Sequence, residues 1–274
     1  MSSPEKSVTL SIDGKIAIIT LNLPKKLNAL TQDLYYRISC LMREIAARND
    51  IYITILTGKG RYFSAGADVT ISRDMHSTGS DSRRQFLSSF VANNLEITNA
   101  FYTHPKILIT ALNGPAIGLS AALIAFSDFI YCTPSTFLLT PFTSLGLVAE
   151  GGSSYAFVQR LGISKANEAL IMSKRITAEE LLHTGFVNKI FPVQKGEEDE
   201  KFLPEVLKEV KERLGDHLNS ESLIKVKELI RKPESERMDA QGVAEVLGGL
   251  ERFVEGVPQQ EFMKIASGQK KHKL

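Results

Sequence analysis

The apolar stretch from Ile107 to Cys132 constrains the fold of this chain most, because its apolar residues must all be covered. A stretch of this length suggests a membrane span, but Asn113-Gly114-Pro115, Gly118 and Asp128 interrupt it. The interruptions leave pieces with the length of a strand or a short helix. The stretch therefore predicts a buried α/β core and no membrane span, with strands over Ile107 to Leu112 and Phe129 to Cys132 and a buried helix over Ser120 to Phe126.

The preceding residues show the same alternation of strands and helices. Val8 to Ile12 and Lys15 to Leu21 flank Asp13-Gly14, which predicts a β-hairpin with a type I′ turn. Apolar residues recur at helical spacing from Thr31 to Ala47, with Thr31 as the N-cap. Further along, the sequence predicts a strand over Ile51 to Thr57, a polar loop over Ser72 to Arg84 and a helix over Phe86 to Tyr102.

The density of charged residues divides the 274-residue chain into two parts. Residues 1–194 carry 18 basic and 14 acidic side chains, whereas residues 195–274, with less than half that length, carry 15 and 17. We expect an α/β core that holds the site over 1–194, and over 195–274 a region of amphipathic helices used for oligomerisation. The net charge of +2 gives no reason to expect a nucleic-acid partner. Cys40 and Cys132 lie in apolar sequence and are interpreted as buried thiols in a reducing compartment.

Motifs of several common enzyme classes are absent from the sequence. It has no Walker loop, no G-x-S-x-G, no H-E-x-x-H, no C-x-x-C and no G-x-G-x-x-G. The five histidines have no spacing typical of metal ligands. We therefore predict no metal and no cofactor.

Three glycine-rich segments interrupt apolar sequence and are candidates for a site. They are Phe63-Ser-Ala-Gly-Ala-Asp68, Asn113-Gly-Pro-Ala-Ile-Gly-Leu119 and Leu145-Gly-Leu-Val-Ala-Glu-Gly-Gly152. The first two place small residues after a strand, where backbone N–H groups can point into a cleft and bind a carbonyl oxygen. The alternative interpretation is that each is only a tight turn between a strand and a helix.

The first two of these segments, the second extended to Leu112, resemble the crotonase (enoyl-CoA hydratase/isomerase) superfamily in order and spacing, together with Leu23-Pro-Lys-Lys-Leu-Asn-Ala-Leu30 and the run from Ile176 to Asn188. The resemblance covers about residues 8–265. It implies an α/β fold made of a spiral of ββα turns, a C-terminal helical region used for trimerisation, and acyl-CoA thioester substrates. It also places the two backbone donors of an oxyanion hole on Ala67 and Leu119.

The acidic residues distinguish between reactions within the superfamily. The two glutamate positions of hydratases are Ala122 and Phe142 in this chain, so hydration of a double bond is not expected. A single acid stands at Glu150, in a setting that resembles peroxisomal Δ3,Δ2-enoyl-CoA isomerases of the yeast type. The resemblance implies that Glu150 carries a proton from C2 to C4 of a 3-enoyl-CoA. The alternative is that Glu150 is an ordinary acid that stabilises a helix N-terminus. The sequence leaves the direction of the Glu150 pKa shift open, because the apolar Leu147 to Ala149 would raise the pKa and the start of the following helix would lower it.

Further residues are expected around this acid. Asn93 and Asn94 interrupt the apolar face of their helix, and Asn94 is the candidate for orienting Glu150. The resemblance places CoA contacts on the loop that holds Lys25, Lys26 and Leu27, where a solvated turn is the alternative. The segment expected to line the substrate consists of Ala65, Gly66, Ala67, Asp68 and Val69.

The final residues, His272-Lys273-Leu274, resemble a peroxisomal targeting tripeptide. They imply a peroxisomal matrix protein that an import receptor binds, and the superfamily implies a homotrimer or a homohexamer.

Other interpretations of the function remain open: a dienoyl-CoA isomerase or a thioesterase of the same superfamily, or a non-catalytic homologue that binds acyl-CoA or RNA. A dienoyl isomerase would need a second acid near Glu150, and Ser144 to Ser154 supplies none. Thr31 to Asp50 carries equal numbers of basic and acidic residues, which argues against RNA.

Overall fold

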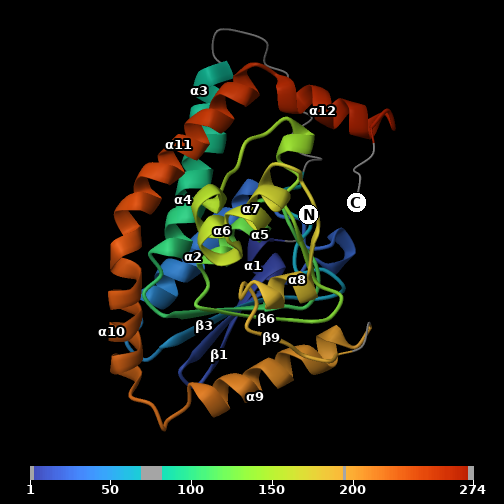
Figure 1. The fold of residues 1–274 in the computed structure, drawn as a ribbon. Helices are drawn as coiled ribbons and strands as arrows, with labels where there is room; N and C mark the ends of the chain where they lie inside the picture. Colours follow the sequence, from blue (N-terminus) through green and yellow to red (C-terminus); the bar gives the residue numbers. More distant parts are fainter. Residues whose placement is uncertain (1–2, 69–81, 194–195, 271–274) are drawn as a thin grey trace.

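A mixed sheet lies at the centre of the computed structural model, which describes residues 3–68, 82–193 and 196–270 (Figure 1). Its strand order within these residues is β1-β2-β3-β4-β6-β9, and only β1 and β2 pair antiparallel. The strands are β1 (Val8–Asp13), β2 (Ile16–Leu21), β3 (Ile53–Gly58), β4 (Ile107–Leu112), β6 (Phe129–Cys132) and β9 (Lys189–Ile190). A smaller sheet joins β5 (Ala116–Ile117), β7 (Phe137–Leu139) and β8 (Ile176–Thr177). The predicted strands and the mixed α/β class are thus confirmed.

The N-terminal hairpin forms as predicted, but its turn differs from the expected one. Asp13 pairs with Ile16, so the two loop residues are Gly14 and Lys15 rather than Asp13 and Gly14. Only Gly14 has a positive φ, of 58°, whereas a type I′ turn needs two residues with positive φ. The prediction of a type I′ turn was wrong, because the strand register places the glycine first in the loop.

Helices cover both faces of the central sheet because its strands bury side chains on both. On one face, a large core includes Ile19, Leu56 and Leu112 together with side chains of α2 and α4. On the other face, Ile18, Ile55 and Ile109 pack against α9. The helices are α1 (Pro4–Ser7), α2 (Gln32–Ala46), α3 (Ser82–Phe86), α4 (Ala92–Tyr102), α5 (Leu119–Leu123), α6 (Ser153–Leu161), α7 (Ile163–Leu170), α8 (Ala178–His183), α9 (Leu203–Arg213), α10 (Ser220–Arg231), α11 (Ser235–Val254) and α12 (Val257–Ala266).

Two predicted helices are confirmed with changes at their ends. Thr31 caps α2 as expected, since its side chain accepts a hydrogen bond from the Leu34 N–H. The helix expected from Phe86 begins earlier, with α3, and a π-helical turn at Leu87–Val91 joins α3 to α4. The expected polar loop over Ser72 to Arg84 was therefore wrong at Ser82 to Arg84, and the rest of it lies outside the described residues.

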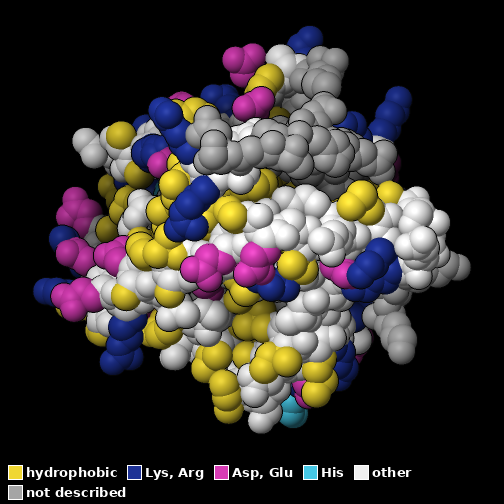
Figure 2. Space-filling model, turned by 90° about the horizontal axis from the view of Figure 1, so that it is seen from above, with side chains coloured by type: hydrophobic (Ala, Val, Ile, Leu, Met, Phe, Trp, Pro, Cys, Tyr) yellow, Lys and Arg dark blue, Asp and Glu magenta, His cyan; other side chains and the backbone are white. Residues whose placement is uncertain are grey.

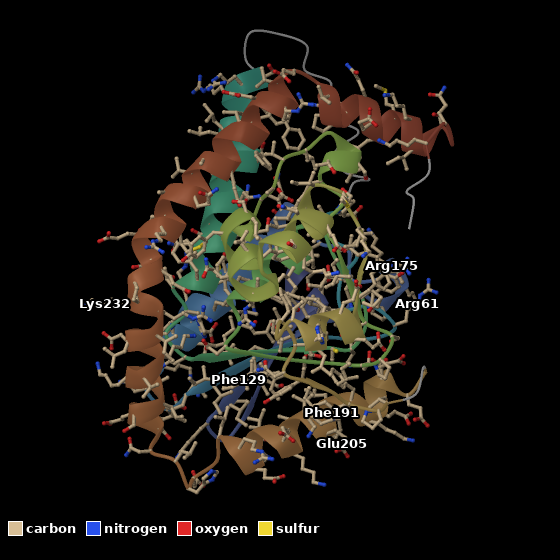
Figure 3. All side chains as sticks on the ribbon, viewed as in Figure 1. Arg61, Phe129, Arg175, Phe191, Glu205 and Lys232 are labelled. Atoms are coloured by element: carbon tan, nitrogen blue, oxygen red, sulfur yellow. The ribbon has the colours of Figure 1, made fainter. Side chains whose placement is uncertain are left out.

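The C-terminal region consists of helices that pack on the core. Phe191, on the segment after β9, contacts the ring of Phe202, and Val206 and Val210 of α9 pack beneath the sheet with them. Figure 3 shows Phe129 and Phe191 between the sheet and α9. Helices α10 and α11 run along the side of the molecule, and α11 contacts α3, α4 and α6 (Figure 1). The amphipathic helices predicted for this region are confirmed.

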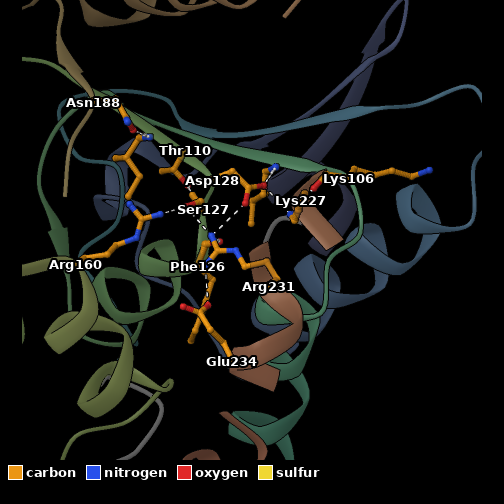
Figure 4. Close-up of polar contacts among 12 residues, drawn as sticks. Lys106, Thr110, Phe126, Ser127, Asp128, Arg160, Asn188, Lys227, Arg231 and Glu234 are labelled. Carbon is orange, nitrogen blue, oxygen red and sulfur yellow. Dashed lines mark hydrogen bonds and ion pairs between the residues drawn. The ribbon is translucent and has the colours of Figure 1, made fainter. Parts of the chain in front are cut away.

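A partly buried carboxylate, that of Asp128, connects α10 to the sheet (Figure 4). One of its oxygens accepts from the Leu108 N–H at 2.8 Å and lies 2.7 Å from Lys227 Nζ, and the other lies 3.1 Å from Arg231. Lys227 also donates to the Lys106 carbonyl oxygen. The same acid that interrupts the apolar sequence therefore connects two cations of α10 to the ends of β4 and β6.

Replacing Asp128 with asparagine should lower the free energy of unfolding by about 3 kcal/mol, because the buried Lys227 loses its counter-charge and Arg231 keeps only its pair with Glu234. Urea unfolding followed by circular dichroism measures the change. Glu228→Gln, which removes the exposed ion pair with Lys225, is the matched control and should cost less than about 1 kcal/mol. A loss at Asp128 as small as that of the control would contradict a structural role for the cluster.

Charged and apolar side chains are interspersed on the upper face of the molecule, where no single charge dominates (Figure 2). This mixture agrees with the net charge of +2. Among the described helices, none has the length and apolar character needed to cross a membrane.

Candidate active site

A cavity of about 300 Å³ brings the predicted site residues together. Ala67, Leu119, Asn94 and Glu150 all line it. The apolar part of the remaining wall includes Leu30, Phe86, Phe90, Ile97, Phe253 and Phe262. Since the last two belong to α11 and α12, the cavity is not confined to residues 1–194, to which the sequence analysis assigned it.

Two glycine-rich loops lie against each other at one end of the cavity. Ser64 pairs with Ala116 in a parallel bridge, and the Ile117 N–H donates to the Ser64 carbonyl oxygen at 2.9 Å. The loops meet so closely at Gly66 that a Cβ atom there would lie 2.7 Å from the Ile117 carbonyl oxygen. Gly66 therefore lets the two loops approach each other, and its φ of +85° also favours glycine.

Ala67 and Leu119, which follow Gly66 and Gly118 on these loops, both line the cavity. The amides next to them in the chain have hydrogen-bond acceptors within the protein: the Gly118 N–H donates to the Leu139 carbonyl oxygen, and the Asp68 N–H donates to the Leu30 carbonyl oxygen. The amides of Ala67 and Leu119 have no acceptor among the described residues. Leu119 is also the first residue of α5, where amides have no partner within the helix. Two adjacent N–H donors facing a cavity form a site that suits a carbonyl oxygen acquiring negative charge.

The carboxylate of Glu150 lies on the same cavity, and Asn94 orients it. Asn94 Nδ2 donates to Glu150 Oε2 at 2.9 Å, and the Thr98 hydroxyl donates to Asn94 Oδ1 at 3.4 Å. The amide is thereby turned with its nitrogen towards the acid. Within the described part of the chain, Glu150 Oε1 accepts no hydrogen bond. One carboxylate oxygen is thus held by Asn94, and the other accepts no hydrogen bond from the described residues.

The structure decides the question of the Glu150 pKa that the sequence left open. The pKa of Glu150 is raised to about 7, mainly by burial and also by the nearby Glu245, while the hydrogen bond from Asn94 acts in the opposite direction. Glu150 does not cap α6, whose N-cap residue is Gly152. Amides at the start of that helix donate to Glu245 instead. A carboxyl group with a pKa close to neutrality can both take up and release a proton.

Tyr35 on α2 is a cavity residue that the sequence analysis missed. Its hydroxyl is 3.0 Å from Ser120 Oγ, which is 2.9 Å from Ser64 Oγ. Ser64 donates to the Asn28 carbonyl oxygen, so Ser120 donates to Ser64 and Tyr35 donates to Ser120. The chain of hydroxyls connects the two glycine-rich loops beneath their amides. Tyr35 has the same spacing as the core residues of its helix, and no sequence signal distinguishes it from them.

Several predicted binding residues lie beside the cavity rather than on it. Ala65 is joined to Leu27 through its N–H, but neither residue lines the cavity, and neither do Gly66 and Lys25. Lys26 pairs with Asp68, which does line it, at 3.1 Å. Val69 lies outside the described residues. Asn93 lines the cavity and donates to the Ser89 carbonyl oxygen, so it does not hold Glu150.

The two positions at which hydratases carry glutamates are buried and apolar here. Ala122 is 0% exposed and Phe142 is 1% exposed. The carboxylates that line the cavity in the described residues are those of Glu150, Asp33 and Asp68. No group of three or more His, Cys, Asp or Glu side chains suited to a metal ion is found in the described ranges.

Comparison with known proteins establishes the family. The model of the enoyl-CoA hydratase/isomerase family matches residues 11–260. The chain belongs to this family. It is 58% identical over 275 residues to a Delta(3,5)-Delta(2,4)-dienoyl-CoA isomerase of Pyricularia oryzae, covering 97% of this chain and 98% of the relative. It is 35% identical to a 3,2-trans-enoyl-CoA isomerase of Saccharomyces cerevisiae, covering 98% and 97% of the two chains.

Solved structures agree with this assignment at the level of the fold. An enoyl-CoA hydratase/isomerase from Pseudoalteromonas atlantica superposes with a TM-score of 0.82 at 25% identity, covering 98% of this chain and all of the other. A family member from Mycobacterium paratuberculosis gives a TM-score of 0.81, covering 94% and 98%. The predicted crotonase-like fold with C-terminal helices is therefore confirmed.

Proposed function

We propose that the protein is a Δ3,Δ2-enoyl-CoA isomerase that uses Glu150 as its single acid/base. The observation that carries the proposal is the placement of Glu150, with one carboxylate oxygen held by Asn94, on a cavity also lined by Ala67 and Leu119, whose amides have no acceptor within the described residues. The family membership supports an enoyl-CoA substrate. The relative from Saccharomyces cerevisiae named above supports this reaction in particular.

The proposed reaction moves one proton between two carbons of the substrate. Glu150 removes a proton from C2 of a 3-enoyl-CoA, and the electron pair of that bond moves onto the thioester oxygen as a dienolate. The N–H groups of Ala67 and Leu119 stabilise the negative oxygen. The same carboxyl group returns the proton to C4, so the double bond ends between C2 and C3. The chemistry needs no metal and no cofactor beyond the CoA of the substrate, and this remains a prediction.

The second candidate is a Δ3,5-Δ2,4-dienoyl-CoA isomerase, which the name of the 58% identical relative favours. That reaction also begins with removal of the C2 proton, but the proton returns to C6, two carbons further along the chain. Besides Glu150, the carboxylates on the cavity in the described residues are Asp33 and Asp68, and Asp68 already pairs with Lys26. Of these carboxylates Glu150 is the one that Asn94 orients, and the shorter proton transfer from C2 to C4 favours the Δ3,Δ2 reaction.

Purified protein incubated with a trans-3-enoyl-CoA and, separately, with a 3,5-dienoyl-CoA tests the assignment. We expect faster turnover of the 3-enoyl-CoA, with the 2-trans product identified by NMR. Faster turnover of the dienoyl-CoA would select the second candidate, and turnover of neither would remove both in favour of an acyl-CoA-binding homologue. Release of free CoA would instead indicate a thioesterase.

The activity should depend on pH through the ionisation of Glu150. Only the carboxylate can take the C2 proton, and its pKa is raised to about 7. We therefore expect kcat/KM to fall as the pH decreases below about 7 and to level off above it. Asn94→Leu should move this acid limb to higher pH, because the hydrogen bond from Asn94 lowers the pKa. An acid limb at the pKa of an ordinary glutamate, about 4.3, would contradict the assignment of Glu150 as the base.

We further propose a peroxisomal location and a homotrimer or homohexamer. A mouse relative, 29% identical, is named "Enoyl-CoA delta isomerase 3, peroxisomal". The targeting tripeptide His272-Lys273-Leu274 lies outside the described residues. One residue added after Leu274 should leave a fluorescent fusion in the cytosol.

Light scattering tests the oligomeric state through the molar mass of the protein in solution. Helix α10 has an exposed apolar face with Val226, Leu229 and Ile230, which suits a contact between subunits.

A further inference from the structure

Glu245 is a buried acid that lies next to the Glu150 turn but comes from a distant part of the sequence. It projects from α11, and 6% of the residue is exposed. Its Oε2 accepts from the Gly152 N–H at 2.6 Å, and its Oε1 accepts from the Ser154 N–H at 2.8 Å and from the Ser154 hydroxyl at 2.5 Å. Three donors from the residues just after Glu150 therefore converge on one carboxyl group.

The direction of these hydrogen bonds favours the ionised form of Glu245. Gln241 Nε2 donates to Ser154 Oγ at 2.7 Å, so the serine hydroxyl has its own proton available for Glu245. The two remaining contacts are backbone N–H groups, which only donate. Burial raises the pKa of Glu245, and the hydrogen bonds from the Ser154 hydroxyl and the two backbone N–H groups act in the opposite direction, because they stabilise the carboxylate.

We propose that Glu245 is a positioning residue for the proton transfer: an ionised carboxylate that holds the Glu150 turn and places a fixed negative charge behind the catalytic acid. The proposal rests on the proposed function, since it concerns the same acid/base. The turn is held because Ser153, between the two clamped residues, donates through both its N–H and its hydroxyl to the Glu150 carbonyl oxygen. Movement of Gly152 or Ser154 would therefore be transmitted to Glu150.

The negative charge has a chemical consequence for Glu150. A like charge nearby disfavours ionisation, and Glu245 raises the pKa of Glu150 in addition to the effect of burial. A carboxylate with a higher proton affinity is a stronger base towards the weakly acidic C2–H bond. The charge of Glu245 thus contributes to the driving force of the first step without touching the substrate.

Other charged or titratable groups near Glu150 do not duplicate this arrangement. Tyr35 and Asp33 on α2 and Asp68 line the cavity. On neighbouring helices, Glu96 of α4 pairs with Arg43, Asp239 of α11 accepts from Tyr102, and Arg252 of α11 binds the Gly146 carbonyl oxygen and Glu255. Arg83 and Arg84 of α3 are exposed. Of the acids named here, Glu245 is the one bound to the residues that follow Glu150.

The direct test is a pH titration of the Glu150 carboxyl group. Carbon NMR monitors the titration, on protein labelled at the glutamate side-chain carboxyl carbons. The Glu150 signal is assigned by its loss in Glu150→Gln. In Glu245→Gln, the Glu150 midpoint should move to lower pH by about one unit. Glu236→Gln, which removes an exposed acid from the same helix, is the matched control and should not move it. An unchanged midpoint in Glu245→Gln would overturn the proposal.

Two further measurements keep the test decisive. If Glu245→Gln does not fold, the titration of the wild-type protein tests the proposal by itself. As the pH falls, Glu150 should take up its proton while Glu245 is still ionised, and the reverse order would overturn the proposal. In Glu245→Asp, which keeps the charge on a shorter side chain, we expect kcat to fall about tenfold with the midpoint retained. Because the titration needs no substrate, its outcome is independent of whether the isomerase assignment itself holds.

Discussion

Glu150→Gln should reduce isomerase activity by about 1,000-fold or more while leaving the binding of a saturated acyl-CoA unchanged. Glutamine has the shape of the acid and can still accept from Asn94, but it cannot take a proton from C2. The steady-state rate on a trans-3-enoyl-CoA and calorimetric binding of the acyl-CoA measure the two quantities. Activity within tenfold of wild type would remove Glu150 from the mechanism.

The stability of this variant gives a separate check on the ionisation of Glu150. A carboxyl whose folded pKa is raised favours the folded state while it is protonated, and this contribution is lost as the pH rises through about 7. Glutamine stays neutral, so Glu150→Gln should melt at a higher temperature than wild type at pH 8 and close to it at pH 5. Glu179→Gln, an exposed acid on α8, is the control and should change neither activity nor this difference.

Gly66→Ala should lower kcat by about 100-fold, the effect of losing one oxyanion donor. The added Cβ would lie 2.7 Å from the Ile117 carbonyl oxygen, so the two glycine-rich loops must separate. Ala67 follows directly in the chain, and its N–H would move away from the amide of Leu119. Single-turnover kinetics on a 3-enoyl-CoA measure the loss in the chemical step.

Gly185→Ala separates this effect from backbone strain. Gly185 has a φ of +79°, close to the +85° of Gly66, but its added Cβ would meet nothing within 4 Å. The control should lose about 1 kcal/mol of stability and keep its activity. Equal losses of activity in the two variants would show that the close contact of the loops does not position the donors.

Prediction from the sequence succeeded where one segment carries its own signal. The strand over Ile107–Leu112 was predicted with its observed ends, since it is apolar and bounded by a turn motif. The N-cap at Thr31 was also predicted from local residues. Asn94 was recognised as a candidate because a polar side chain interrupts an apolar helical face, and in the structure it donates to Glu150.

Contacts between distant segments were not predictable in the same way. Glu245 follows Glu150 by 95 residues, and only the packing of α11 on α6 brings them together. A signal existed, because Glu245 shares a helical face with Met238, Gly242 and Gly249, all of which are buried. The contribution of Phe253 and Phe262 to the cavity was missed for the same reason, since residues 195–274 were assigned to oligomerisation and targeting.

The transfer of deuterium within one substrate molecule tests the single-acid mechanism most directly. A 3-enoyl-CoA carrying two deuterium atoms at C2 is converted in ordinary water during a single turnover, and NMR locates the label in the product. If Glu150 alone carries the proton, and is shielded from solvent by the bound substrate, deuterium should appear at C4 in a fraction of the product. A product with only solvent hydrogen at C4, at every quench time, would contradict transfer by one carboxyl group.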